Sequence, residues 1–309
     1  MSTRSTPKDH RMAPHVALVL VQIMFGTWPI FGKVVLRSMS STSLVGLRIL
    51  GAAVIFTLLQ RRVSDLRRLP KRIFLWLVLS SLLGVVLNQL LFVKGLSFTT
   101  AINATLLTTT IPVFTLIVSI TLGHDRASLR KFFGITLAAA GVIYLVDPWR
   151  ANFTAETTLG NIFVLCSSFC YGTYIAVSRE LFRRYGALTV ITWIFLVGAV
   201  LALPIAALSW SGEEFGRVSA GVFLLLLGII LVPTVGAYYL NGWASARVPP
   251  SVVAIYIYLQ PLLAFGLAPV VLGESWNSRT IVACLLIFAG VAVVTIRGKV
   301  SSAEFRVSS

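Results

Sequence analysis

Acidic residues are scarce in this sequence, which has only 10 Asp and Glu among 309 residues, against 26 Lys and Arg. Charged residues of both signs together make up 12% of the chain, whereas a soluble globular domain carries about 25%. Hydrophobic residues reach 57%, and the mean hydropathy is +0.90. The composition therefore excludes an ordinary soluble domain and predicts an integral membrane protein.

Residues that carry enzyme or metal chemistry are also few, with 3 Cys and 3 His in the whole chain. Cys166, Cys170 and Cys284 lie inside apolar runs without the spacing of a metal site or a disulfide, and we interpret them as small packing residues. The apolar runs contain no paired carboxylates, no His-rich cluster and no nucleophile beside a base. We therefore expect no catalytic residues, no metal, no cofactor and no enzymatic activity.

No carboxylate or histidine falls deep within an apolar run. A proton-driven antiporter generally needs such a group inside the membrane to carry the proton. The pattern favours facilitated diffusion or exchange.

A net charge of +16 would suggest nucleic-acid binding in a soluble protein, but here Lys and Arg lie mostly in the short breaks between apolar runs. We interpret them as topogenic charge, because cytoplasmic loops of membrane proteins are enriched in Lys and Arg. The side of the membrane that includes both termini receives most of the 26 basic residues. This predicts cytoplasmic tails at residues 1–13 and 298–309, and no nucleic-acid partner.

The chain contains ten apolar segments, each close to the roughly 20 residues that a helix needs to cross a bilayer. They cover residues 14–37, 43–60, 73–95, 101–122, 131–147, 159–182, 187–209, 219–241, 250–272 and 279–296. Backbone polar groups in lipid must be satisfied within the segment itself. We therefore expect an all-α membrane protein with ten transmembrane helices.

The sequence repeats itself. Residues 149 positions apart match in three places, which are Pro112 and Pro261, Asp125 and Glu274, and Gly141 and Gly290. A further match, at an offset of 146, joins Phe25-Gly26-Thr27-Trp28 to Tyr171-Gly172-Thr173-Tyr174. The repeats are predicted to cover residues 14–150 and 151–297 with five helices each. Because five is odd, the second repeat must enter the membrane from the opposite face, and inverted repeats of this kind place a substrate near the midplane between them.

Several of these segments resemble the drug/metabolite transporter superfamily, specifically its ten-helix EamA-type members. The resemblance is carried by Gly26-Thr27-Trp28, Arg48, Leu96-Ser97-Phe98-Thr99-Thr100-Ala101 ahead of Pro112, and Leu272-Gly273-Glu274 followed by Gly290-Val291. It implies export or exchange of amino acids and other small metabolites across the bacterial inner membrane. It also implies a central cavity lined by helices 1, 3, 4, 6, 8 and 9.

Neutral polar and aromatic side chains at mid-depth are the candidate substrate ligands, because a polar group in hydrocarbon needs a partner. These candidates are Trp28, Asn88, Asn103, Thr109, Tyr171, Tyr174, Tyr239, Tyr256, Tyr258 and Gln260. For Thr109 and Gln260 two interpretations stay open, because each precedes a proline. They either line the cavity or satisfy the backbone carbonyl that the proline leaves free.

Three cations near the outer helix ends, Lys33, Lys94 and Arg48, form a possible charged vestibule for an anionic or zwitterionic solute. As an alternative, the two lysines are simple interfacial charges, and Arg48 is a structural anchor whose charged head reaches the membrane surface.

Two transport functions follow. The first is a secondary transporter that exports or exchanges a small metabolite, most simply an amino acid or derivative. The alternative is an importer of a quaternary-ammonium or other organic cation held in an aromatic cage. A Lys or Arg projecting into the cavity would oppose the second. The expected partners are the small-molecule substrate and the lipid bilayer, for a monomer or a homodimer.

Overall fold

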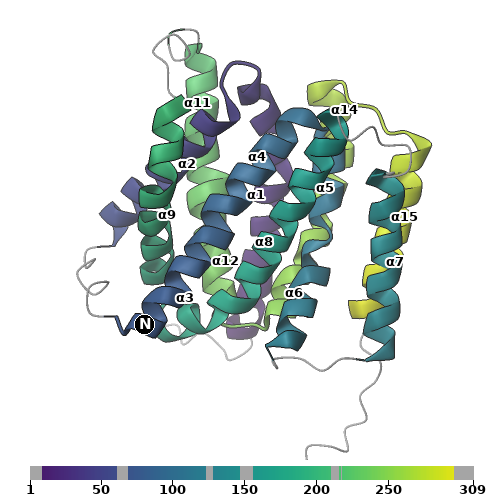
Figure 1. The fold of residues 1–309 in the computed structure, drawn as a ribbon, viewed down its shortest axis with the longest axis horizontal. Helices are drawn as coiled ribbons and strands as arrows, with labels where there is room; N and C mark the ends of the chain where they lie inside the picture. Colours follow the sequence, from purple (N-terminus) through teal and green to yellow (C-terminus); the bar gives the residue numbers. More distant parts are fainter. Residues whose placement is uncertain are drawn as a thin grey trace, which may run out of the picture.

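The structure, a computed structural model, describes residues 9–60, 69–122, 128–146, 156–209, 216 and 218–295. This part of the chain is entirely helical and contains no strand (Figure 1). Asp125, the boundary near residue 150 and the C-terminal tail 298–309 lie outside the described residues, as do residues 1–8 of the N-terminal tail. Predictions about those positions stay predictions.

The helices fall into a first half, α1 to α7, and a second half, α8 to α15. The first half comprises α1 (Asp9–Leu36), α2 (Ser41–Leu59), α3 (Lys71–Ser81), η2 (Leu82–Leu87), α4 (Asn88–Phe98), α5 (Ala101–Thr108), α6 (Ile111–Thr121) and α7 (Leu129–Val146). The second half comprises α8 (Glu156–Tyr185), α9 (Ala187–Ser209), α11 (Ala220–Ile229), η3 (Ile230–Gly236), α12 (Ala237–Ser245), α13 (Pro250–Ile255), η4 (Tyr256–Leu259), α14 (Gln260–Leu272) and α15 (Ser278–Thr295).

Eight helical stretches of the described chain are long and apolar enough to cross a membrane. They are Met12–Leu36, Ser41–Leu59, Lys71–Phe98, Ala101–Thr121, Glu156–Tyr185, Ala187–Ile205, Ala220–Ser245 and Val252–Leu272. These correspond to eight of the ten predicted segments and confirm a multi-pass helical membrane protein. The fifth and tenth predicted segments are helices too, α7 and α15, each of 18 residues. That these two also cross the membrane stays a prediction.

Two of the long stretches contain a wide helical turn at equivalent positions of the repeat. The first is η2, between α3 and α4, and the second is η3, between α11 and α12. Pro233 in η3 has no backbone N–H, and the neighbouring Thr234 hydroxyl donates to the Ile229 carbonyl at 2.8 Å. Wide turns of this kind are often found at functional sites.

The two repeat-related prolines also follow helix interruptions. The helix is interrupted between α5 and α6 just ahead of Pro112. Ahead of Pro261 it narrows into the 3₁₀ turn η4. The hydroxyls of Thr108, Thr109 and Thr110 donate to backbone carbonyls three residues earlier, at 2.6 to 2.7 Å. The Leu106 and Leu107 carbonyls also accept the backbone N–H groups of Thr109 and Thr110 at 3.1 Å, so these hydroxyls add a second hydrogen bond at the interruption.

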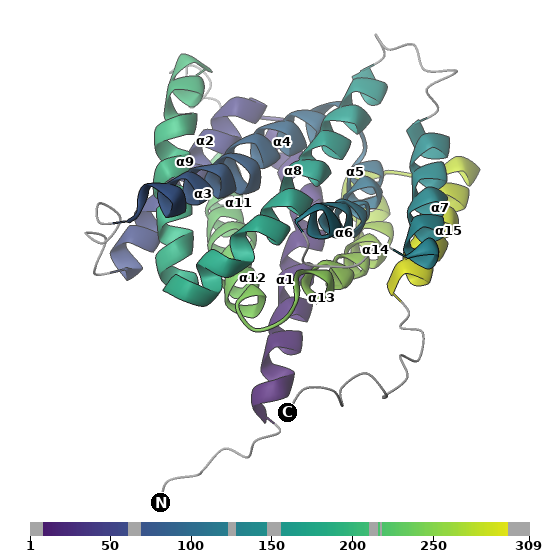
Figure 2. The ribbon, with the colours of Figure 1, turned by 60° about the horizontal axis from the view of Figure 1, so that its bottom comes forward.

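The first helix of each half packs against broken helices of the other half. Helix α1 lies near the centre of the molecule and contacts α12 and α14, while α8 contacts α4 and α6 (Figure 2). Two close backbone approaches between these helices are related by the repeat. A Cβ on Gly26 would lie 3.2 Å from the Cα of Gln260, and one on Gly172 would lie 2.9 Å from the carbonyl oxygen of Ile111. Gly26 and Gly172 are 146 residues apart, and Ile111 and Gln260 are 149 apart.

Helices α7 and α15 pack on each other at one edge of the bundle (Figures 1 and 2). A Cβ on Gly141 would lie 2.9 Å from the backbone nitrogen of Ile287 and 3.0 Å from the carbonyl oxygen of Ala283. Small residues allow such close helix packing in membranes. The small-residue face around Gly141 is therefore used within the chain.

We predict that Gly172→Ala destabilises the protein by about 1–3 kcal/mol, because the added methyl group overpacks backbone atoms of α6 that cannot rotate away. Thermal unfolding in detergent, followed by circular dichroism, measures the change. Gly228→Ala in α11 is the matched control, since a Cβ there meets nothing within 4 Å. Equal melting temperatures for the two variants would show that the α6–α8 contact is not close.

Candidate substrate-binding site

A cavity of about 60 Å³ lies where helices of both halves meet near the middle of the long spans. Its lining residues are Phe25, Trp28, Pro29, Arg48, Asn88, Gln89, Phe92, Thr108, Ile111, Ser167, Tyr171, Tyr238 and Gln260. They come from α1, α2, α4, α5, α6, α8, α12 and α14. These are the six spans that the family resemblance implies, with α2 added through Arg48.

The small volume of this cavity indicates which conformation the protein adopts. Pockets that enclose small organic ligands measure about 300–1,000 Å³, whereas 60 Å³ has room for only a few water molecules. The cavity is therefore contracted around its own side chains in this conformation and must widen to admit a solute.

Arg48 is the charged residue of the cavity wall, and only 2% of it is exposed. Its guanidinium lies over the ring of Trp28, 3.8 Å from the centroid, and its Nε donates to the Thr234 hydroxyl at 3.1 Å. Among the described residues no carboxylate lies within 4.0 Å of it. The sequence placed Arg48 near the membrane surface, but the structure turns it inward, and stacking on Trp28 partly offsets the cost of its burial.

Two neighbouring amides on α4 line the same wall and differ in their hydrogen bonding. Asn88 donates to the Ser167 hydroxyl at 2.9 Å and Ser167 donates back to the Asn88 carbonyl at 3.0 Å, which joins α4 to α8. Gln89 is 2% exposed, and neither its amide nitrogen nor its amide oxygen makes a hydrogen bond of 3.5 Å or less in the described part, although the Tyr238 phenol lies close by. An unsatisfied buried amide is costly, so Gln89 is available for a ligand.

Aromatic rings make up much of the cavity wall. Phe25 packs edge-on against Tyr171 and Tyr238, with ring centroids 6.2 and 5.7 Å away. Both phenols have polar partners, since Tyr238 donates to the Gly84 carbonyl at 3.0 Å and Tyr171 accepts from Asn241 at 3.2 Å. The hydrogen bonds fix the rings in place, and their faces are left for an apolar group.

Gln260 closes the cavity on the α14 side. Its amide nitrogen donates to the Gln22 side chain at 2.7 Å, and its amide oxygen lies 3.2 Å from the Thr108 hydroxyl oxygen. Gln260 is thus both part of the wall and a link between α14, α1 and α5.

Of the ten neutral candidates, Trp28, Asn88, Tyr171 and Gln260 line this cavity and six do not. The positions outside it are Asn103, Thr109, Tyr174, Tyr239, Tyr256 and Tyr258. Two of these six have clear structural partners, because the Thr109 hydroxyl is bound to the Leu106 carbonyl and Tyr256 is bound to His15 at 2.7 Å.

The other four lie elsewhere in the helices. Asn103 is in the first turn of α5, where its backbone nitrogen is capped by Thr100. Tyr174 packs behind Tyr171, Tyr239 is 37% exposed, and Tyr258 packs against Phe288.

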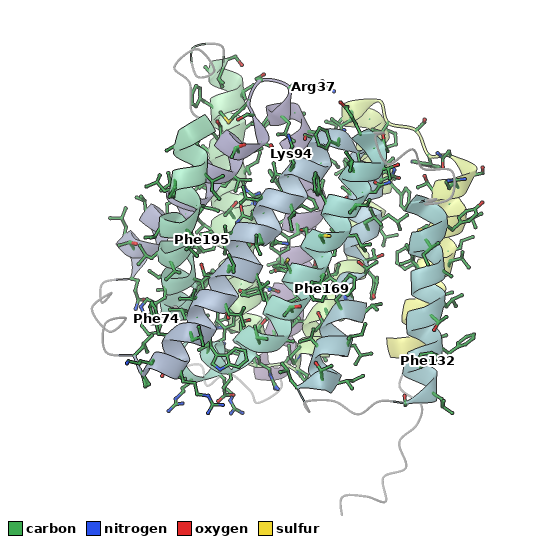
Figure 3. All side chains as sticks on the ribbon, in the orientation of Figure 1. Arg37, Phe74, Lys94, Phe132, Phe169 and Phe195 are labelled. Atoms are coloured by element: carbon green, nitrogen blue, oxygen red, sulfur yellow. The ribbon has the colours of Figure 1, made fainter. Side chains whose placement is uncertain are left out.

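The structure separates the three predicted vestibule cations. Arg48 lines the cavity, whereas Lys94 is exposed at the end of α4, with its ammonium 4.6 Å from the centre of the Phe98 ring (Figure 3). Lys33 is near the end of α1, 4.0 Å from the Glu274 carboxylate. That carboxylate also accepts hydrogen bonds from the backbone nitrogens of Ala101 and Ile102 at 2.8 and 3.0 Å.

Gln89 and Tyr238 were not among the candidates, although each is a polar residue at depth. They are 149 residues apart and are therefore each other's counterparts in the repeat, so a search that starts from the candidates finds neither. Phe25 and Tyr171 are likewise paired at 146, and Ile111 and Gln260 at 149. All six line the cavity, so testing the repeat counterpart of each candidate would have predicted more of the site.

Known proteins resemble this chain over most of its length. The uncharacterized transporter YetK of Bacillus subtilis is 25% identical over 94% of this chain and 88% of its own. A probable terminal-alkyne amino-acid exporter of Streptantibioticus cattleyicolor is 26% identical over 69% of this chain and 70% of its own. One solved structure, titled only "Crystal structure of protein", is 18% identical and has a TM-score of 0.63 over 92% of this chain and 96% of its own. The two proteins therefore share the same fold.

The family comparison covers both halves. The EamA-like transporter family matches residues 12–146 and again residues 158–296. The duplication and the expectation of a transporter are thereby confirmed. The chain belongs to the EamA-like transporter family, whose members are transporters and not enzymes.

Proposed function

We propose that the protein is a secondary transporter that exports or exchanges a small organic metabolite, an amino acid or derivative, by alternating access. The observation that carries the proposal is the cavity whose walls are built from repeat-related residue pairs of the two halves. A pseudo-symmetric pair of halves has two related conformations, each open to one side. The contracted cavity fits an intermediate between them.

We further propose ten transmembrane passes in two inverted five-helix repeats, in the bacterial inner membrane with both termini cytoplasmic. Helices α7 and α15 have 18 residues each, which gives about 27 Å, close to the thickness of a bilayer core. The distribution of Lys and Arg supports the orientation. The repeats would correspond to residues 14–150 and 151–297.

Polar links between the halves support a closed state at both ends. At the end that we assign to the outside, Glu274 of the second half binds Lys33 and the first turn of α5. At the opposite end His15 of α1 binds Tyr256 of η4 at 2.7 Å. Each link joins a first-half element to a second-half element, so opening on either side requires the corresponding link to break.

The cavity favours an amino acid or derivative over the alternative of a quaternary-ammonium cation. Arg48 lies in its wall, and a positive charge in low-dielectric surroundings repels a bare cation. The relative described as a probable amino-acid exporter supports the same solute class.

Trp28→Leu tests the cavity. We expect it to lower the initial rate of phenylalanine uptake into proteoliposomes at least tenfold, because removing a stacked ring from a desolvated cation costs about 2 kcal/mol. Trp243→Leu is the control, since Arg247 lies over that ring at the same 3.8 Å but outside the cavity. Uptake that falls equally in both variants would argue against a specific role of the cavity.

Glu274→Gln tests the outer link. Losing the charge weakens two hydrogen bonds and the contact with Lys33, by about 1.5–3 kcal/mol in total. With the three cysteines replaced by serine and Thr108→Cys as a cavity reporter, we expect an impermeant maleimide added to intact cells to label roughly tenfold faster. Glu180→Gln, in an exposed intrahelical pair with Arg183, is the control. An unchanged labelling rate would mean that Glu274 does not hold this end closed.

Proton coupling gives a further prediction. The described glutamates, Glu156, Glu180 and Glu274, all lie at or near helix ends. We therefore expect the initial rate of uptake to change less than about twofold when a gradient of about one pH unit is imposed across the proteoliposome membrane. A pH-sensitive dye inside the vesicles verifies the gradient. Strict dependence of uptake on that gradient would reveal a proton carrier.

A further inference from the structure

The charge balance of the cavity wall identifies the chemical group that the solute must carry. We propose that Arg48 and Gln89 together bind a carboxylate of the transported solute, and that an apolar or aromatic group beside it packs on the rings of the cavity. This inference rests on the proposed transport function and specifies its substrate class.

Arg48 has donors left over. Its Nε is used by Thr234, while the two terminal nitrogens of the guanidinium have no hydrogen-bond partner among the described residues. The ring of Trp28 covers one face of the group. A buried guanidinium without a carboxylate is costly, and a carboxylate can accept two parallel hydrogen bonds from it. A ligand carboxylate would supply the missing charge.

Gln89 provides a second donor in the same wall. Its amide nitrogen is buried and unpartnered, and α4 holds it in place through the mutual hydrogen bonds of Asn88 and Ser167. Both Gln89 and Arg48 line the one cavity. An amide N–H that lines the same cavity as a guanidinium suits an anion better than a neutral carbonyl group, because charged acceptors make the stronger hydrogen bonds.

The rest of the lining fits an apolar side group. Phe25, Phe92, Ile111 and the faces of Tyr171 and Tyr238 supply most of the remaining surface. Among the described lining residues no carboxylate stands opposite Arg48 to bind an ammonium group. The carboxylate is therefore the required feature, and a plain monocarboxylate should bind as well as a zwitterionic amino acid of the same shape.

Arg48 could instead serve only to tie α2 to η3 through Thr234. The two roles differ in a measurable way. A structural tie predicts that removing the charge lowers stability without changing which solutes bind, whereas a carboxylate site predicts a loss of selectivity.

Three probes of similar shape separate these outcomes: 3-phenylpropionate, phenylalanine and the neutral 3-phenylpropionamide. Their affinities are measured by isothermal titration calorimetry on the purified full-length protein, and their uptake is measured in proteoliposomes. We expect the two carboxylates to bind at least tenfold more tightly than the amide. The two carboxylates should bind with affinities within about twofold of each other, because the lining offers no carboxylate for the ammonium group.

The variants Arg48→Gln and Gln89→Glu test the residues. Each should lower the affinity for 3-phenylpropionate at least tenfold and leave that for the amide within twofold, since the first removes the cation and the second supplies a competing carboxylate. Gln89→Glu keeps the test decisive if Arg48→Gln fails to fold, because Glu has nearly the shape of Gln and Gln89 makes no hydrogen bond of 3.5 Å or less. Arg247→Gln, which removes the exposed Arg that stacks on Trp243, should leave affinities unchanged.

Equal affinities for all three probes, including no binding of any, would overturn the inference. So would wild-type affinity for 3-phenylpropionate in Gln89→Glu. These results are distinct from a failure of the proposed function, which would appear as carboxylate binding by the wild-type protein without movement of any probe across the vesicle membrane. Transport of all three probes at one rate would keep the transporter and remove the carboxylate site.

Discussion

The close backbone contact between the first helix of each half and a broken helix of the other half is the constraint on which the rest of the structure depends. Gly26 meets Gln260 on α14, and Gly172 meets Ile111 on α6, with space for no side chain at either glycine. These two contacts bring α1 and α8 into the opposite halves and so place the two helices against the cavity. The cavity wall is therefore drawn from both halves.

The helix interruptions sit where these contacts require them. A straight helix that satisfies all its own backbone groups presents only side chains to its neighbours. The wide turns η2 and η3 and the breaks ahead of Pro112 and Pro261 instead expose backbone carbonyls, one of which, that of Gly84, accepts a hydrogen bond from Tyr238. The threonine hydroxyls donate to carbonyls near Pro112. The scaffold is therefore irregular in both halves at related positions, close to the site.

The scaffold is nearly symmetric, but the chemistry of the cavity is not. The position that matches Arg48 at the repeat offset of 146 is Ile194, a fully buried apolar residue. Gln89 matches Tyr238, and Ile111 matches Gln260. One repeat thus contributes the cation and its neighbouring amide, and the other contributes a phenol and a second amide. A symmetric frame can alternate between two states, while an asymmetric lining allows a solute to bind in one defined orientation.

The sequence alone determined the class of the protein. Its long apolar segments, the repeated prolines and glycines, and the positive charges between segments indicate a duplicated helical membrane transporter. These features can be read locally because each segment must satisfy the requirements of the lipid by itself. The substrate-facing residues were less predictable. Trp28, Asn88, Tyr171 and Gln260 line the cavity, whereas Tyr258, two residues before Gln260, does not, and Tyr256 lies toward one end of the bundle beside His15. Depth along a helix follows from the sequence, but the direction a side chain faces depends on how α1 and α8 cross into the opposite half. Only the tertiary structure decided that Arg48 turns inward onto Trp28, because its partners on α1 and η3 are brought to it by packing across the two halves.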